Sequence, residues 1–173
     1  MRSSELVCQH MNDYEQRPGE IRLPFDPAER AADASVTFVG RIRSPWKDRS
    51  ECPKNMAQAR ESRRSARLEI DSVWRPGLEG LQDHGVAIVL YWMDQARRDL
   101  IVQRPRHRGG RVGVFGLRSP ARPNPIALAV VRIVAIDQAE GTVEIDAIDC
   151  LDGTPLLDIK PWLKSVDYSP DFS

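Results

Sequence analysis

Two apolar runs flank a short segment with three prolines, and this arrangement restricts the fold more than any other part of the chain. The runs span residues 112–117 and 126–136, and the segment between them reads RSPARPNP. Runs rich in Val, Ile and Phe favour strands on a largely buried surface. Each proline fixes its own φ and pushes the preceding residue toward an extended backbone, so no helix is expected here. The sequence predicts two strands joined by a rigid, basic loop.

Further apolar segments with strand character are spaced along the chain by turn signals. They include residues 36–43, 66–70, 86–93 and 141–149. Helical periodicity is sparse, so we predict a mostly β architecture with few short helices, closed as a barrel. A chain of 173 residues that is 41% hydrophobic suits one globular domain.

The first 34 residues have a different character from the rest. They mix charges, amides and prolines and show no sustained period of two or 3.6 residues. We therefore predict an extended or partly disordered N-terminal arm over residues 1–34 and a barrel domain over residues 35–173. The few apolar residues of the arm, Ile21, Leu23 and Phe25, are candidates for docking on a neighbouring surface or a second subunit.

Charge is distributed unevenly although the formal net charge is zero. Residues 100–136 contain no acidic residue but hold seven arginines, which are Arg104, Arg106, Arg108, Arg111, Arg118, Arg122 and Arg132. Such a local excess of positive charge favours binding of a phosphate backbone or a carboxylate. A flexible, solvated loop is the alternative for residues 94–110.

Cysteine and histidine usage gives no support for disulfides or a metal site. The three cysteines are odd in number and widely spaced, and the three histidines do not cluster with carboxylates at ligand spacing. We predict reduced thiols, a cytoplasmic location and no metal. No run approaches membrane-spanning length, and the N-terminus lacks the apolar region of a signal peptide.

Three motifs, in the same order along the chain, resemble those of the TsaA-like or VirR-like family. The loop motif RSPARPNPI spans residues 118–126, FVGRIRSPW at residues 38–46 resembles the family's opening strand, and LDGTPLLDIKPW at residues 151–162 resembles its closing segment. Together they cover roughly residues 36–168. The characterised branch of this family consists of tRNA N6-threonylcarbamoyladenosine methyltransferases.

The resemblance implies a single-sheeted β-barrel that binds S-adenosylmethionine near a homodimer interface. The implied reaction is methyl transfer to the exocyclic nitrogen of threonylcarbamoyladenosine beside the tRNA anticodon. The sequence has no GxGxxG motif after a first strand, so it does not indicate a Rossmann-type methyltransferase.

The resemblance also implies which residues contact the cofactor. These candidates are Pro53, Lys54, Asn55, Val86, Ala87, Arg118, Leu128, Ile148, Asp149, Cys150 and Leu151. Two departures stand out, because Lys54 and Asn55 replace the family's Arg and Gln, and Val86 falls at the position of a histidine. The planar fork of Arg118 suits the methionyl carboxylate.

Candidates for the chemistry and for the substrate come from side-chain type. Asp152, in the DGTP turn, is the candidate base that removes the proton from the ureido nitrogen, and capping of the turn is its alternative role. Arg122 and Asn124 are candidates for the threonyl carboxylate or an anticodon phosphate, and Arg106 and Arg108 for phosphates.

Three other functions remain open at this point. Well-studied bacterial members carry a further C-terminal domain, whereas this chain ends soon after the closing motif, so RNA recognition would fall to the barrel, the arm and the arginine-rich loops. The alternatives are a methyltransferase with another substrate and a non-enzymatic S-adenosylmethionine-binding regulatory dimer. An RNA-binding barrel without a cofactor would instead show strongly salt-dependent RNA affinity.

Overall fold

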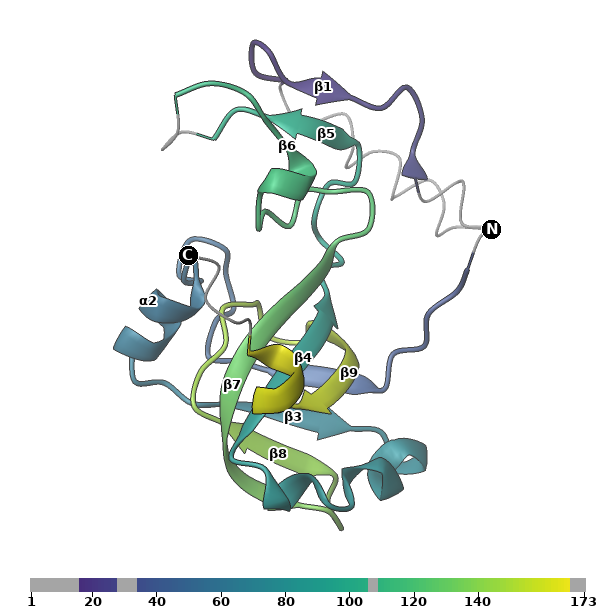
Figure 1. Ribbon diagram of the computed structural model, residues 1–173, viewed down its shortest axis with the longest axis vertical. Helices are drawn as coiled ribbons and strands as arrows, with labels where there is room; N and C mark the ends of the chain where they lie inside the picture. Colours follow the sequence, from purple (N-terminus) through teal and green to yellow (C-terminus); the bar gives the residue numbers. More distant parts are fainter. Residues whose placement is uncertain (1–15, 28–33, 106–108, 169–173) are drawn as a thin grey trace. The chain divides into compact units, whose positions relative to one another are not determined.

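The computed structural model describes residues 16–27, 34–105 and 109–168 (Figure 1). The chain divides into two compact units, each built from separate stretches of sequence. One unit comprises Met1–Ser35 with Gln95–Pro125, and the other comprises Val36–Asp94 with Ile126–Ser173. We call them the loop unit and the barrel unit and describe each by itself.

The barrel unit is a closed six-stranded barrel in which all neighbouring strands are antiparallel. Its strands, in spatial order, are β2 (Gly40–Arg43), β3 (Ala66–Ile70), β8 (Thr142–Ile145), β7 (Ile126–Asp137), β4 (Val86–Trp92) and β9 (Pro155–Pro161). The barrel closes where β9 pairs with β2, with Leu156 opposite Gly40. The longest ladder joins β4 to β7 and runs from the Val86–Arg132 pair to the Trp92–Ile126 pair.

The core of the barrel follows from the two-residue period of its strands. Along β4 buried residues alternate with partly exposed ones, so Ala87, Val89 and Tyr91 point inward. The largest side chains that are fully enclosed in this unit are aliphatic, namely Ile42, Leu68, Ile145, Ile148, Leu156, Val89, Val131 and Val143. Position 40 requires a glycine for a steric reason, because a Cβ there would lie 1.9 Å from the Glu69 carbonyl oxygen on the paired strand.

Short helices complete the barrel unit. They are α2 (Met56–Glu61), η2 (Ser72–Leu78), η3 (Leu81–Asp83) and α3 (Lys164–Asp167), where η marks a 3-10 helix. Helix α2 begins at Asn55, whose Oδ1 accepts a hydrogen bond from the Gln58 N–H at 3.0 Å. This is the usual way in which an Asn side chain satisfies a free donor at a helix start.

The loop unit contains a separate three-stranded sheet in the order β1-β5-β6. The strands are β1 (Ile21–Arg22), β5 (Leu100–Gln103) and β6 (Val112–Gly113), followed by η4 (Val114–Gly116). Part of the predicted N-terminal arm therefore pairs with a segment about eighty residues later, because Arg22 lies opposite Leu100.

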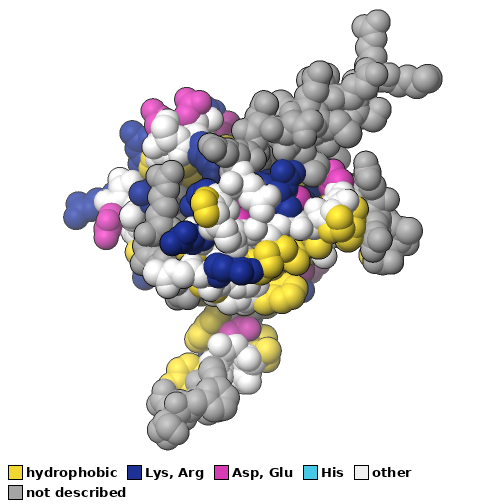
Figure 2. All heavy atoms as spheres, turned by 90° about the horizontal axis from the view of Figure 1, so that it is seen from above, with side chains coloured by type: hydrophobic (Ala, Val, Ile, Leu, Met, Phe, Trp, Pro, Cys, Tyr) yellow, Lys and Arg dark blue, Asp and Glu magenta, His cyan; other side chains and the backbone are white. Residues whose placement is uncertain are grey.

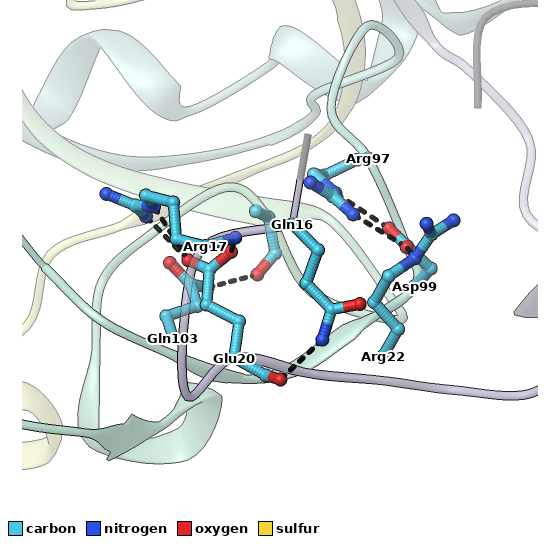
Figure 3. Close-up of polar contacts among 8 residues, drawn as sticks. Gln16, Arg17, Glu20, Arg22, Arg97, Asp99 and Gln103 are labelled. Atoms are coloured by element: carbon cyan, nitrogen blue, oxygen red, sulfur yellow. Dashed lines mark hydrogen bonds and ion pairs between the residues drawn. The ribbon is translucent and has the colours of Figure 1, made fainter. Parts of the chain in front are cut away.

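Ion pairs connect the segments of the loop unit (Figure 3). Arg97 donates two hydrogen bonds of 2.8 Å to the buried Asp99 carboxylate, and Arg22 donates another. Burial alone would raise the pKa of Asp99, but these guanidinium groups hold that pKa below its ordinary value. Glu20 is also buried, and Arg17 lowers its pKa in the same way, against the effect of burial.

The structure confirms the predicted mostly β fold with few short helices. The prediction of a single sheet was wrong. A second sheet exists because β1 and β6 pair with β5 and not with any barrel strand. The strand expected at residues 112–117 is also shorter, since the chain turns into η4 after Gly113. Within the described ranges, no helix combines the length and the apolar character needed to cross a membrane.

Candidate cofactor site

The segment of residues 148–151, which follows β8, is fixed to the rest of the barrel unit through its carbonyl groups. The Ile148 oxygen accepts from Trp46 Nε1 at 2.9 Å, and the Cys150 oxygen accepts from Ser44 Oγ at 2.7 Å. Ile148 and Cys150 are fully buried. Trp46 is in turn covered by the guanidinium group of Arg64, 5.3 Å from the centre of its ring. The segment therefore has one defined conformation.

Two N–H groups of this segment are available to a ligand. Among the residues that the structure describes, no acceptor pairs with the backbone N–H of Asp149 or of Leu151. Both residues are partly exposed, so a ligand can reach these donors. Backbone N–H groups in a protein nearly always have an acceptor, supplied by protein, water or a ligand. The ring nitrogens of an adenine are acceptors of the required kind.

The DGTP turn follows directly and is tightly bound. Asp152 accepts a hydrogen bond of 3.1 Å from the Ser44 N–H and one of 2.5 Å from Lys47 Nζ. The hydrogen bond from Lys47 lowers the pKa of Asp152, and the Ser44 N–H adds to this effect against partial burial. Gly153 takes a φ of +81°, a left-handed conformation that favours glycine.

A tyrosine at the end of β4 reaches the same segment. The Tyr91 hydroxyl donates to Asp149 Oδ1 at 3.0 Å, and burial followed by the nearby Asp149 charge raises the pKa of Tyr91. Burial, and then the same carboxylate, raises the pKa of Cys52 to about 11. The loop with Cys52 and Pro53, the end of β4 and residues 148–151 therefore lie close together. The sequence reasoning missed Tyr91 and Cys52, although Tyr91 supplies the polar group in the apolar run of residues 86–93.

The predicted cofactor residues fall in different parts of the barrel unit. Pro53 is half-buried beside Cys52, whereas Lys54 is exposed and Asn55 caps α2. Leu128 lies on β7 opposite Leu90, with 41% of its surface exposed. Val86 and Ala87 are at the start of β4, whereas Tyr91 is near its end.

The remaining predicted residues belong to the loop unit, where the proline-rich loop is held by its neighbours. Arg122 donates from Nε to the Ser119 oxygen at 2.9 Å, and from Nη2 to the Val114 oxygen at 2.8 Å and to the Leu117 oxygen. Gln103 donates to the Ala121 oxygen at 2.6 Å. The guanidinium group of Arg122 thus fixes the loop in which Arg118 is exposed.

Asn124 is also tied to its own unit. Arg98 donates to the Pro123 oxygen at 2.6 Å and to Asn124 Oδ1 at 3.4 Å. Asn124 is nevertheless exposed. Arg106 and Arg108 lie outside the described residues.

Residues 41–168 match the family described as the tRNA-methyltransferase O N-terminal domain. The chain belongs to this family. The match covers well over half of the sequence and contains the DGTP turn, the RSPARPNPI loop and most of the opening-strand motif, so the resemblance seen in the sequence is confirmed.

Three similar proteins show how the family relates to this chain. The VirR protein of Rhizobium radiobacter, a probable S-adenosyl-L-methionine-binding protein, is 41% identical over 151 residues, which are 87% of this chain and 82% of VirR. A tRNA (adenine(37)-N6)-methyltransferase of Mus musculus is 28% identical over 152 residues, 85% of this chain and 35% of the mouse protein. A crystal structure of TrmO from Pseudomonas aeruginosa superposes with a TM-score of 0.63 at 29% identity, covering 81% of this chain and 60% of that chain.

The chain therefore spans most of VirR but only about three fifths of the TrmO chain. Within the part of the chain that the structure describes, no three His, Cys, Asp or Glu side chains form a group that could hold a metal ion.

Proposed function

We propose that this member of the tRNA-methyltransferase O family is an S-adenosylmethionine-dependent enzyme that N6-methylates threonylcarbamoyladenosine next to the tRNA anticodon. The observation that carries the proposal is the pair of available N–H donors at Asp149 and Leu151, within the stretch that matches the family. Donors held by a buried, hydrogen-bonded segment suit a purine ring, because the protein has already fixed their positions.

We propose the following roles for the chain's own residues. The N–H groups of residues 148–151 hold the adenosyl part, and the aliphatic Leu128 with Pro53 lines the site. Arg118, in the loop unit, stays the predicted partner of the methionyl carboxylate, because its two-pronged guanidinium group matches two oxygens. S-adenosylmethionine, when bound, supplies an electrophilic methyl group on sulfur. The protein's contribution is to align the acceptor nitrogen with that group, which lowers an entropic barrier.

A proton must leave the acceptor nitrogen as the new N–C bond forms, and Asp152 was the candidate base. Its contacts favour the structural role, because its carboxylate is held by Lys47 and by the Ser44 N–H. A depressed pKa also makes the carboxylate a weaker base. We therefore propose that Asp152 chiefly fixes the DGTP turn.

The substrate side remains part of the proposal. The exposed Asn124 presents its amide to the substrate, while Arg122 acts indirectly by holding the loop. Arg106 and Arg108 stay predictions for phosphate contacts. The contacts made by Val86 and Ala87 also stay predictions.

We further propose a cytoplasmic homodimer. Its support is a set of exposed aliphatic residues on one face of β7, which are Ile126, Leu128 and Val130 at successive outward positions and Val134 beyond Arg132, each between 38% and 58% exposed. Exposed apolar surface of this kind is typical of interaction sites. Leu128 belongs to this set and to the proposed cofactor site.

A non-enzymatic S-adenosylmethionine-binding regulator is the second candidate function. The observation in its favour is the name of VirR, which describes binding and not catalysis. A methyltransferase with another substrate shares the cofactor site and differs only in its acceptor. Both alternatives predict cofactor binding, so a test of catalysis must accompany a test of binding.

The test is calorimetric titration of the full chain with S-adenosylmethionine, followed by incubation with tRNA that carries threonylcarbamoyladenosine. We expect saturable binding that Arg118→Ala weakens about tenfold or more, the effect of losing a charge-assisted pair. Arg104→Ala is the matched control for the cofactor titration alone, since Arg104 is an exposed arginine of the same unit without a proposed cofactor contact. Mass spectrometry of the digested tRNA should show one added methyl group on the modified adenosine.

The outcomes separate the candidates. Absence of binding to the folded chain overturns every function that requires the cofactor. Binding without methylation of any RNA favours the regulator, and methylation of a different acceptor favours the alternative substrate.

A further inference from the structure

Phe115 is almost completely exposed, which is unusual for a phenylalanine. It lies at the centre of η4 with 96% of its surface accessible, and the next most exposed large apolar side chain among the described residues is Val166 at 74%. Full exposure of an aromatic ring is unfavourable in water, so the ring is a candidate for contact with a ligand or a partner.

The turn that presents Phe115 is rigid. Val114, its neighbour, is 2% exposed, and the Val114 oxygen accepts hydrogen bonds from the Leu117 N–H at 3.2 Å and from Arg122 Nη2 at 2.8 Å. The ring therefore projects from a backbone whose conformation these hydrogen bonds fix. A ligand that stacks on such a ring loses little binding free energy to the ordering of the protein.

The loop unit that carries Phe115 has an excess of exposed positive charge. The described carboxylates of this unit are Glu20, Asp26 and Asp99, and Glu20 and Asp99 are buried against arginines. Arg104 and Arg111, in contrast, are exposed. Figure 2 shows basic side chains spread across the middle of one face of the molecule, interspersed with apolar ones.

The isolation of the ring argues for a nucleobase and against a second protein. Among the described residues of the loop unit, the exposed large apolar side chains are Phe115 and Ile21, the latter 39% exposed. A protein interface needs a contiguous apolar centre. One exposed aromatic ring in a unit with exposed arginines is instead the combination that binds single-stranded nucleic acid, through base stacking and phosphate contacts.

We propose that Phe115 is a stacking platform for an unpaired base of RNA, with Arg104 and Arg111 on the phosphates nearby. This inference rests on the proposed RNA substrate and names the surface that receives it. The platform acts in binding and takes no part in the chemical step.

The test measures the affinity of a fluorescein-labelled anticodon stem-loop RNA by anisotropy, using the full chain and its variants. We expect Phe115→Ala to weaken binding about tenfold and Phe115→Leu to weaken it nearly as much, because leucine is apolar but offers no π-face. Phe115→Trp should bind as well as the native chain or better. Val73→Ala is the matched control, because Val73 is 72% exposed in η2 of the barrel unit.

Salt dependence adds a second readout. Stacking releases no counterions, so Phe115→Ala should leave the slope of log affinity against log salt concentration unchanged. Arg111→Ala should reduce that slope by about one. Equal affinity of Phe115→Ala and the native chain overturns the proposal, as does unimpaired binding by Phe115→Leu.

Two further measurements distinguish RNA stacking from a role of Phe115 in a dimer interface or in the cofactor site. Sedimentation of Phe115→Ala should show the same oligomeric state as the native chain, and a loss of association would place the ring in an interface between copies and overturn the proposal. Titration with S-adenosylmethionine should be unaffected by Phe115→Ala. If the native chain binds RNA through Phe115 but transfers no methyl group, the proposed function fails while this inference stands.

Discussion

The barrel unit and the loop unit are stabilised in different ways. The barrel encloses a large aliphatic core, and its buried polar residues are Ser44 and Thr154. The loop unit has short strands and buries Glu20, Asp99 and Gln103. Burial of apolar area is insensitive to pH, whereas a buried carboxylate depends on its charge and on its partners.

The difference also separates two kinds of surface in this chain. The barrel supplies a scaffold on which residues 148–151 have one defined conformation, and the loop unit supplies exposed arginines and Phe115 from backbone that side chains hold in place. Four predictions test whether the two units depend on apolar burial and on ion pairs as described.

The largest effect is expected for Leu68→Ala in the barrel core. Leu68 is fully buried, so its truncation should lower the free energy of unfolding by about 2–5 kcal/mol through lost burial and a cavity. All four tryptophans lie in the barrel unit, so urea unfolding followed by tryptophan fluorescence reports on it directly. Leu163→Ala, at a side chain 39% exposed, should change the value by about 0.5 kcal/mol or less. Equal effects of the two substitutions would contradict a core-stabilised barrel.

Asp99→Asn should open the loop unit without unfolding the barrel. The substitution removes the charge that faces Arg97 and Arg22, and breaking a buried pair of this kind costs about 3 kcal/mol. Hydrogen exchange should become faster in β1 and β5, while the tryptophan transition stays at the same urea concentration. Asp158→Asn is the control, because the Asp158–Lys160 pair is exposed on the barrel. If Asp99→Asn also shifted the urea concentration at which the barrel unfolds, the two units would unfold as one cooperative system, and the comparison would be wrong.

Acidification should act on the loop unit before the barrel core. The pKa values of Glu20 and Asp99 are depressed in the folded state. Their stabilising contribution is therefore complete above the unfolded pKa values, near pH 4, and is lost as pH falls through the folded values. Backbone amide signals of β1 and β5 should broaden below about pH 4 in NMR spectra, ahead of those of β3. If the amide signals of β3 broadened at the same pH as those of β1 and β5, the two units would not differ in their dependence on charge.

The smallest effect is expected for Glu69→Gln on the outside of the barrel. Glu69 pairs with Arg43 at 2.7 Å and with Arg67 at 3.2 Å, but these side chains are between 36% and 49% exposed. Water screens ion pairs this exposed, so they contribute little to stability. A double-mutant cycle with Arg43→Ala should give a coupling energy far below the effect of Leu68→Ala, and a comparable value would show that ion pairs stabilise the barrel as well.

Local sequence chemistry was sufficient for the class of the fold and for several of its elements. The strand at residues 66–70 has the predicted bounds, and the proline-rich loop contains no helix. These features depend on side-chain period and on proline geometry, which act within a few residues. The family could be recognised because its motifs are contiguous in sequence.

Contacts between distant segments were decided only by the tertiary structure. No local signal pairs β1 with β5, directs the Tyr91 hydroxyl to Asp149, or turns the Arg122 guanidinium back onto the loop that carries it. The identity of a residue specifies the hydrogen bonds it can make, but the partner depends on which segments the whole chain brings together. The sequence by itself therefore determined the β-rich class, the rigid loop and the family, and the tertiary structure decided the second sheet and the neighbours of each candidate site residue.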